Sequence, residues 1–238
     1  MQDTLIGGAG ADTLNGRSGT DVMIGGTGDD LYVFDSSFDW VWEGANGGYD
    51  GIIIDSRILS NLPTGAGVSV WMPEGIEWLR LWGGGFAGIG NAADNWISGG
   101  EGVNILIGGA GADTLRSGGG GDHLAGGAGA DLFWLNSSRD LITIWDFEPG
   151  VDRLLFPRAI TRAEERAIIE NHSINWGPHT YMEVDFGWEV SSFARPNLKL
   201  LFVNTTRESL WASSDTWLGW NEALPNAHWS LSYESFGL

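Results

Sequence analysis

Glycine and aspartate recur every nine residues in two stretches of this chain, and this period restricts the possible fold more than any other feature. In the first array, units begin at Gly7, Gly16 and Gly25, and each has an aspartate at its sixth place. In the second array, five units begin at residues 90, 99, 108, 117 and 126. A short, strict period predicts stacked coils that bury a continuous core between neighbours.

Each unit divides into a turn of six residues and a strand of three. Glycine at the first, second and fourth places permits positive φ and lets main-chain carbonyl groups crowd together. The eighth place is always apolar, so its side chain is predicted to point into the core. The residues at this place are Leu5, Leu14, Met23, Tyr32, Ile97, Leu106, Leu115, Leu124 and Phe133.

The composition favours bound cations. The chain has 31 acidic and 12 basic residues, and its formal net charge of -19 argues against nucleic acid or an anionic membrane surface as a partner. It has no cysteine, which excludes disulfides and thiolate metal sites. Turns that offer carbonyl and carboxylate oxygens at flexible geometry suit Ca²⁺ better than Mg²⁺. Acidic, glycine-rich stretches are also typical of flexible linkers, but the strict register favours folded coils with several calcium ions.

The units resemble the RTX, or hemolysin-type, calcium-binding nonapeptide repeats. The family pattern G-G-x-G-x-D-x-U-x is matched in full from Gly7, Gly25, Gly108 and Gly126. The resemblance implies an all-β fold, a parallel β-roll in which two repeats form one coil. It also implies that turns 18 residues apart bind calcium between them, and that the protein reaches the extracellular space or cell surface by bacterial type I secretion.

The resemblance also suggests how the chain is divided. We expect a first array at residues 1–43, a β-rich connector at 44–89, a second array with its terminal turn at 90–152, and a small C-terminal α/β cap at 153–238. The connector resembles the family's link between arrays, so one continuous β structure is predicted. In the cap we expect a helix at about 161–171, strands within 180–190 and 197–203, and strands or a closing turn within 208–220. The cap resembles that of type I secreted proteins, which implies an uncleaved secretion signal in the last tens of residues. The opening residues show no signal-peptide pattern, and we expect no membrane span.

The resemblance implies a defined set of calcium ligands. One turn supplies the carbonyl groups of its second and fourth places and its sixth-place aspartate. The turn 18 residues later supplies the carbonyl groups of its first and third places and its own sixth-place aspartate. The two best sites combine Gly8, Gly10 and Asp12 with Gly25, Thr27 and Asp30, and Gly109, Gly111 and Asp113 with Gly126, Ala128 and Asp131. Two further candidates combine Gly100, Gly102 and Asn104 with Ser117, Gly119 and Asp122, and Gly118, Gly120 and Asp122 with the turn that ends at Asp140. The remaining residues assigned to the calcium stacks are Asp21, Asp39, Gly108 and Ala110.

Departures from the family pattern put some sites in doubt. Asn95 and Asn104 bring no charge to the sixth place, so their sites are predicted to bind weakly or to stay empty. Arg17 takes a second-place position near Asp21, which weakens the case for that edge of the array. After the second array, Asp146, Glu148 and Asp152 are compatible with a further calcium site or with a polar turn, and the sequence leaves this choice open.

Catalysis has no clear basis in the sequence, and we expect no enzymatic activity. Neither H-E-x-x-H nor G-x-S-x-G occurs, and the histidines show no spacing suited to a metal. Surface or packing roles are therefore expected for His123, His172, His179 and His228.

Tryptophan is unusually frequent, with 14 in 238 residues. The register places several of these side chains outside the roll, where the cap covers them, they form contacts between copies, or they stack on sugar rings. We favour assembly, which predicts a structural protein that folds with calcium and forms a homo-oligomer, filament or surface layer. The alternatives are the secretion and folding module of a larger exoenzyme, or a module that binds a polysaccharide or mediates adhesion. The outward tryptophans are Trp40, Trp42, Trp78, Trp82, Trp96 and Trp134.

Overall fold

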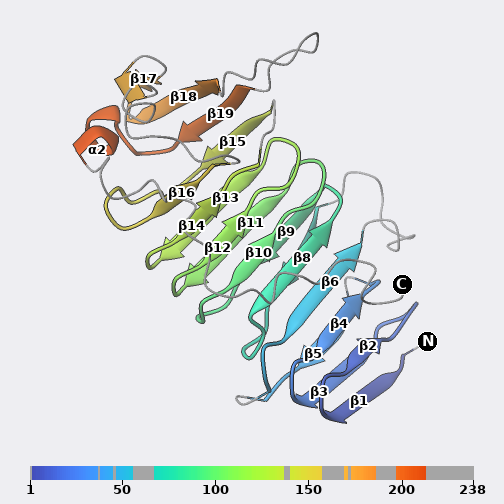
Figure 1. Cartoon of the computed structure of the whole chain (residues 1–238). Coiled ribbons are helices and arrows are strands. Elements are labelled where there is room, and N and C mark those ends of the chain that lie inside the picture. Colours follow the sequence, from blue (N-terminus) through green and yellow to red (C-terminus); the bar gives the residue numbers. More distant parts are fainter. Residues whose placement is uncertain are drawn as a thin grey trace.

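The fold is a parallel β-solenoid in which successive strands alternate between two faces (Figure 1). This computed structural model describes residues 2–36, 38–44, 47–55, 67–136, 140–156, 169–170, 173–185 and 197–212. The predicted all-β roll is thus confirmed.

One face is a single parallel sheet of eight even-numbered strands, in the order β16-β14-β12-β10-β8-β6-β4-β2. It runs through both arrays and through the connector. Its strands are β2 (Thr13–Asn15), β4 (Leu31–Phe34), β6 (Gly51–Asp55), β8 (Trp78–Trp82), β10 (Trp96–Ser98), β12 (Thr114–Arg116), β14 (Leu132–Trp134) and β16 (Arg153–Leu155).

The odd-numbered strands form the other face, in two sheets. The first contains β1 (Thr4–Ala9), β3 (Val22–Thr27) and β5 (Trp40–Trp42). The second begins with β7 (Val68–Trp71), β9 (Phe86–Ile89), β11 (Ile105–Ala110), β13 (His123–Ala128) and β15 (Leu141–Ile144). On the even-numbered face β6 pairs with β4 and β8 pairs with β10, so the connector joins both arrays in one sheet and the prediction of one continuous β structure is confirmed there. On the odd-numbered face β9 pairs with β11, and the sheet is interrupted between β5 and β7.

The core is built from the eighth places of the repeats. Leu14 stacks on Tyr32, and Ile97 stacks on Leu115 and then on Phe133. Eight of the nine predicted inward side chains are buried, and Leu5 in the first coil is half-buried against them. The alternation of strand residues therefore directs one apolar side chain per repeat inward, as the period predicts.

The spacing between coils departs from 18 residues at two places that matter for the sites. Tyr32 pairs with Ile52, and Leu124 pairs with Ile144, so each of these coils has two extra residues. In the second case, the residue level with Asp122 is Ile142 rather than Asp140. The predicted continuation of the repeat register to Asp140 is therefore wrong.

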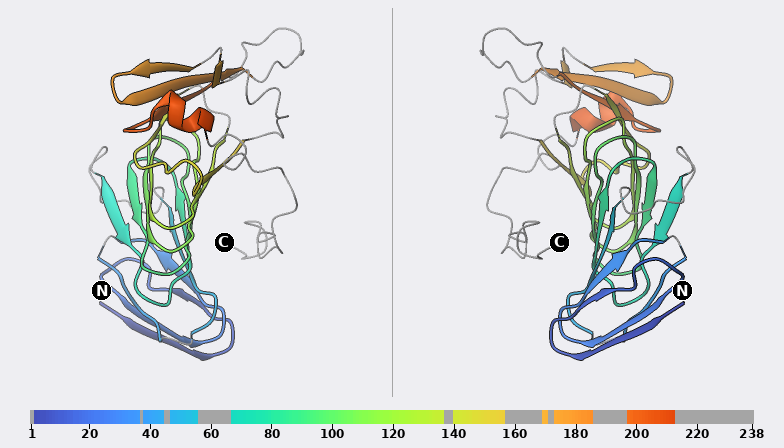
Figure 2. Two further views of the ribbon diagram at one scale, coloured as in Figure 1. Left: turned by 90° about the vertical axis from the view of Figure 1, so that its left-hand side faces the viewer. Right: turned by 90° about the vertical axis from the view of Figure 1, so that its right-hand side faces the viewer.

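The C-terminal strands extend the odd-numbered face at the end of the roll opposite β1 (Figure 2). Strand β19 (Asn197–Phe202) pairs parallel with β15 and antiparallel with β18 (His179–Asp185), which pairs with β17 (Ser173–Trp176). The two strand predictions in this region are confirmed over these ranges.

Helix α2 (Arg207–Ala212) lies where a strand or closing turn is predicted. The error has a local cause: Thr206 caps this helix, because its hydroxyl accepts a hydrogen bond of 3.2 Å from the N–H of Ser209. Of the helix predicted at 161–171, Ile169 and Glu170 are helical, and the rest lies outside the described residues. The proposed secretion signal also lies outside them. Within the described part of the chain, no helix is long and apolar enough to cross a membrane.

Candidate metal sites

The sixth-place carboxylates form a ladder along each side of the roll. Oδ1 of each accepts a hydrogen bond from the main-chain N–H of the residue at the same place one coil earlier. This bond is 2.8 Å from Asp12 to Asp30 and 2.9 Å from Asp113 to Asp131. The same arrangement links Asp30 to Asp50, Asn95 to Asp113, Asp131 to Asp152, Asp3 to Asp21, Asp21 to Asp39, and Asn104 to Asp122.

The second oxygen of most of these carboxylates has no such partner. Oδ2 is buried and accepts no hydrogen bond from any described residue in Asp12, Asp21, Asp30, Asp50, Asp113 and Asp131. A buried anionic oxygen without a partner is strongly unfavourable, and a bound cation supplies what it lacks. The donor set therefore fits a hard divalent cation.

First-place glycines leave room for this cation. A Cβ on Gly7 would lie 2.6 Å from Oδ2 of Asp12 and 2.8 Å from the carbonyl oxygen of Gly25. At Gly108, a Cβ would lie 2.5 Å from the carbonyl oxygen of Gly126 and even closer to Oδ2 of Asp113. Carboxylate and carbonyl oxygens thus converge on a space that any side chain would fill.

The other predicted carbonyl groups face the same gaps between turns. A Cβ on Gly26 or Gly28 would press on the carbonyl oxygen of Gly8 or Gly10 in the previous coil, and a Cβ on Gly127 or Gly129 would press on that of Gly109 or Gly111. Positive φ at these glycines allows the orientation. From the other side, the carbonyl oxygens of Thr27 and Ala128 accept the N–H groups of Gly10 and Gly111 at 2.7 and 3.0 Å. The structure therefore brings the predicted ligands of both best sites together.

The predicted site around Asn104 is arranged differently. Its side-chain N–H₂ group lies 3.0 Å from the carbonyl oxygen of Gly102, to which it donates, and 3.5 Å from the carbonyl oxygen of Gly100 and from Oδ1 of Asp122. Oδ2 of Asp122 accepts the N–H of Gly118 at 3.1 Å. The amide thus takes the position that a cation occupies in a charged site, which supports the prediction of a weak or empty site. The neighbouring Ser117 is buried, and its hydroxyl accepts the N–H of Asn136.

Asp140 and the terminal turn offer less to a cation. Asp140 is exposed and out of register, although its charge lies near enough to raise the pKa of Asp122. Asp146 accepts hydrogen bonds from the N–H groups of Gly126 and Gly127, and Asp152 accepts those of Asp131 and Glu148. Because all four oxygens of Asp146 and Asp152 are engaged, the structure favours the polar-turn alternative.

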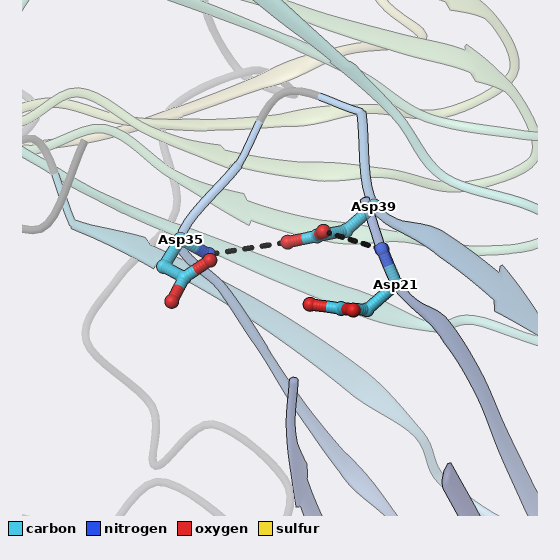
Figure 3. A group of neighbouring side chains, drawn as sticks. All are labelled: Asp21, Asp35 and Asp39. Atoms are coloured by element: carbon cyan, nitrogen blue, oxygen red, sulfur yellow. Dashed lines mark hydrogen bonds between the residues drawn. The ribbon is translucent and has the colours of Figure 1, made fainter. Parts of the chain in front are cut away.

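Two acidic clusters gather carboxylates that the repeat pattern leaves out. Asp21, Asp35 and Asp39 each offer an oxygen within 4.8 Å of the others (Figure 3). Asp30, Glu43 and Asp50 do the same on the other side of the roll. Asp35, Glu43 and Asp50 were not predicted as ligands. The acidic D-x-V-x-E motif from Asp39 to Glu43 was the signal in the sequence that could have indicated Glu43.

Burial raises the pKa of several of these acids. It is the main cause for Glu43, Asp113 and Asp122, whose pKa values are each raised to about 7, and for Asp152, raised to about 6. The neighbouring carboxylate of Asp50 raises the pKa of Glu43 further, and that of Asp131 raises the pKa of Asp113 further. Without a cation the roll therefore holds these acids in a partly protonated state at neutral pH.

A comparison with known protein families agrees with this donor set. The model of the RTX calcium-binding nonapeptide repeat matches residues 2–32, 89–124 and 116–143, in four copies. A search of curated proteins finds no match. Among solved structures, the chain is similar to the solution structure of the AlgE6R3 subunit from the Azotobacter vinelandii mannuronan C5-epimerase. The two are 22% identical with a TM-score of 0.42, over 66% of this chain and 86% of that one.

Proposed function

We propose, from the premise that this chain carries RTX calcium-binding nonapeptide repeats, that it is a secreted structural protein which folds on calcium and then assembles with copies of itself. Secretion is proposed because RTX repeats are typical of secreted proteins. We propose no catalytic role. The observation that supports assembly best is the apolar outer surface of the odd-numbered strands.

Calcium dependence follows from the buried carboxylates. Their unpartnered oxygens lie one above another along the roll, and the formal net charge of -19 adds repulsion. In a compartment with little free calcium, this repulsion opposes folding. At the millimolar calcium of an extracellular medium, the ions neutralise the stacks, and their binding free energy becomes folding free energy.

The outer surface of the odd-numbered strands carries large apolar side chains in register. Ile6 pairs with Ile24, which pairs with Trp42, and Trp71 begins a second row that continues through Ile89. Trp42 is 72% exposed and Trp71 is 68% exposed. Of the predicted outward tryptophans, Trp40 and Trp42 are exposed, and Trp78, Trp82, Trp96 and Trp134 are half-buried; Trp71 was not among those predicted. Large exposed apolar surface is typical of an interaction site, and a flat regular face suits a second copy of the same chain.

The test is size-exclusion chromatography with light scattering, in calcium and in excess chelator. We expect a monomer with a low free energy of unfolding in chelator and large assemblies in calcium. A folded, strictly monomeric protein in calcium at high concentration would remove the assembly proposal and leave the calcium-binding roll intact.

Carbohydrate binding is the second candidate, and the even-numbered face favours it. Trp78 and Trp96 are neighbours in register there. On the same face, the guanidinium of Arg80 lies 4.3 Å from the ring of Trp82, and that of Arg116 lies 5.1 Å from the ring of Trp134. Aromatic rings beside positive charge suit acidic polysaccharides. Affinity electrophoresis in gels that contain an acidic polysaccharide, with a neutral one as control, distinguishes this role from assembly.

A further inference from the structure

Repeat turns end after the first array, and a side-chain carboxylate takes the place of a repeat carbonyl there. In the repeats, the carbonyl oxygen of a first-place glycine lies next to the first-place glycine one coil earlier. This holds for Gly7, Gly90 and Gly108. Next to Gly25, the three atoms that a Cβ would meet first are instead Oε1 of Glu43, Oδ2 of Asp30 and the hydroxyl oxygen of Tyr32. Glu43 thus supplies the oxygen that the missing repeat does not.

Glu43 also reaches the next coil. A Cβ on Gly47 would lie 2.7 Å from Oε2 of Glu43 and 2.5 Å from Oδ2 of Asp50. The hydroxyl of Tyr32 donates a hydrogen bond to Oε1 of Glu43 and so fixes the carboxylate between the two coils. Asp30 and Asp50 are only 2% and 0% exposed, and Oδ2 of each lacks a hydrogen-bond partner in the described structure. Three carboxylates therefore face one another, and no described residue donates a hydrogen bond to the second oxygen of Asp30 or of Asp50.

The opposite side of the roll repeats this arrangement around Asp39. Its Oδ1 accepts the N–H of Asp21 at 3.1 Å, and its Oδ2 accepts the N–H groups of Asp35 and Ser36 at 3.3 and 3.1 Å. The loop between β4 and β5 thereby brings the side chain of Asp35 beside Asp21 (Figure 3). Asp21 is fully buried, and neither its Oδ2 nor Oδ1 of Asp35 accepts a hydrogen bond from a described residue.

We infer that Asp35 and Glu43 complete two carboxylate-rich calcium sites, one on each side of the roll, where the first array meets the connector. The inference rests on the proposed calcium-binding function and extends it to residues outside the nonapeptide pattern. Each site has three carboxylates, whereas a repeat site has two. More ligand charge gives tighter calcium binding, so these sites are expected to fill before the repeat sites and to hold the connector against the array.

The end of the second array provides a contrast. Asp146 lies beside Gly126 there, but both of its oxygens accept main-chain N–H groups. Among the described residues, Asp146 also belongs to no cluster of three carboxylates, whereas Glu43 lies in one with Asp30 and Asp50.

The test is to count bound calcium by equilibrium dialysis and elemental analysis of the full chain. The variants are Asp35→Asn, Glu43→Gln and the double variant, with Glu74→Gln and Glu101→Gln as controls, because these two glutamates are exposed and belong to neither cluster. We expect each single variant to lose one tightly bound ion per chain and the double variant to lose two. Controls should bind as many ions as the unaltered protein. Unchanged counts in Asp35→Asn and Glu43→Gln would overturn the inference.

A measurement on the unaltered protein covers the case in which a variant does not fold. Crystals grown with Tb³⁺ should show anomalous scattering peaks among Asp21, Asp35 and Asp39 and among Asp30, Glu43 and Asp50. Peaks at the repeat sites alone would overturn the inference. Because ion counts and peaks do not depend on assembly, a failure of the assembly proposal would be seen separately, as a monomer with all of its ions.

Discussion

The main-chain N–H of Asp12 donates a hydrogen bond of 2.8 Å to Oδ1 of Asp30, while Oδ2 of the same Asp30 is buried with no hydrogen-bond partner in the described structure. The two oxygens of one carboxylate therefore have different tasks. Oδ1 holds two neighbouring coils in register, and Oδ2 is left for a cation. Since Asp131 is arranged in the same way, the division of tasks is a property of the repeat.

Substitution of Asp131 by asparagine separates these two tasks. The amide oxygen still accepts the N–H of Asp113, but the N–H₂ group replaces the oxygen that faces the cation. We expect one calcium ion fewer and a calcium midpoint for folding, followed by far-UV circular dichroism, that rises by at least about tenfold. The matched control is Asp94→Asn, because Asp94 is exposed and accepts the N–H of Ala112 through Oδ1. An equal midpoint in both variants would contradict the assignment.

The reverse substitution, Asn104→Asp, should create a site. The amide of Asn104 now donates to the carbonyl oxygen of Gly102 and lies against Asp122. A carboxylate removes this donor and adds a charge next to Asp122, so a cation must take its place. We expect one additional ion in calcium and a less stable fold in chelator, measured by dialysis and by chemical denaturation. An unchanged ion count would show that the amide is not what keeps this gap empty.

The sequence was sufficient for the parts of the structure that follow the nine-residue period. Inward side chains such as Tyr32 and Phe133 follow from the spacing, because the period fixes the strand face. The carboxylate pair Asp12 and Asp30 follows when the family resemblance adds that two repeats form one coil. The period fails where residues are inserted. Asp50 lies 20 residues after Asp30 and Ile142 lies 20 after Asp122, so a search at intervals of 18 overlooks the first and selects Asp140 instead of the second.

Ligands outside the repeats could not be predicted for a different reason. Asp35 and Glu43 reach the clusters through the path of a loop and through a hydrogen bond from Tyr32, and neither is encoded in a period. Helix α2 was overlooked similarly, since its apolar residues fit a short strand equally well and the cap at Thr206 decides between them.

Calcium should remove the dependence of stability on pH that the calcium-free fold shows. Burial raises the pKa of Asp113 from 3.8, and that of Glu43 from 4.5, to about 7 in the folded state. Between the pKa values of the unfolded acids and those of the folded acids, the calcium-free folded chain binds more protons than the unfolded chain. Its free energy of unfolding therefore falls as the pH rises toward 7 and then levels off. Calcium needs the deprotonated acids, so its affinity should rise over the same range. Denaturation curves in chelator should show a free energy of unfolding that falls as the pH rises toward 7, whereas curves in saturating calcium should lack this fall, because calcium keeps the acids deprotonated. The same fall under both conditions would contradict the prediction.

Substitution of Gly108 by alanine tests the space beside the carboxylate. Its Cβ would lie 2.5 Å from the carbonyl oxygen of Gly126 and would press on Oδ2 of Asp113, which closes the gap to a cation. We expect the calcium affinity of this site to fall by about 10- to 100-fold, measured by isothermal titration calorimetry. Gly44→Ala is the control, because a Cβ there would meet no atom within 4 Å. Equal losses in both variants would point to a general effect of alanine on the chain.

Exposed tryptophan on the odd-numbered face should decide whether the roll assembles. Trp42 and Trp71 lie on β5 and β7, whereas Trp176, which is 69% exposed, lies on β17 in the cap. If the outer face of the roll is the contact between copies, Trp42→Ser and Trp71→Ser each remove a large apolar group from it and should raise the concentration for half-assembly about thirtyfold. Trp176→Ser removes a similarly exposed ring from β17, which lies beyond the repeats at the opposite edge of the same sheet from β7, and should change it little. Sedimentation velocity in calcium measures all three. Because none of these side chains is in the core, folding in calcium should be retained, and equal effects of the three substitutions would mean that exposed tryptophan in general, rather than this face, drives association.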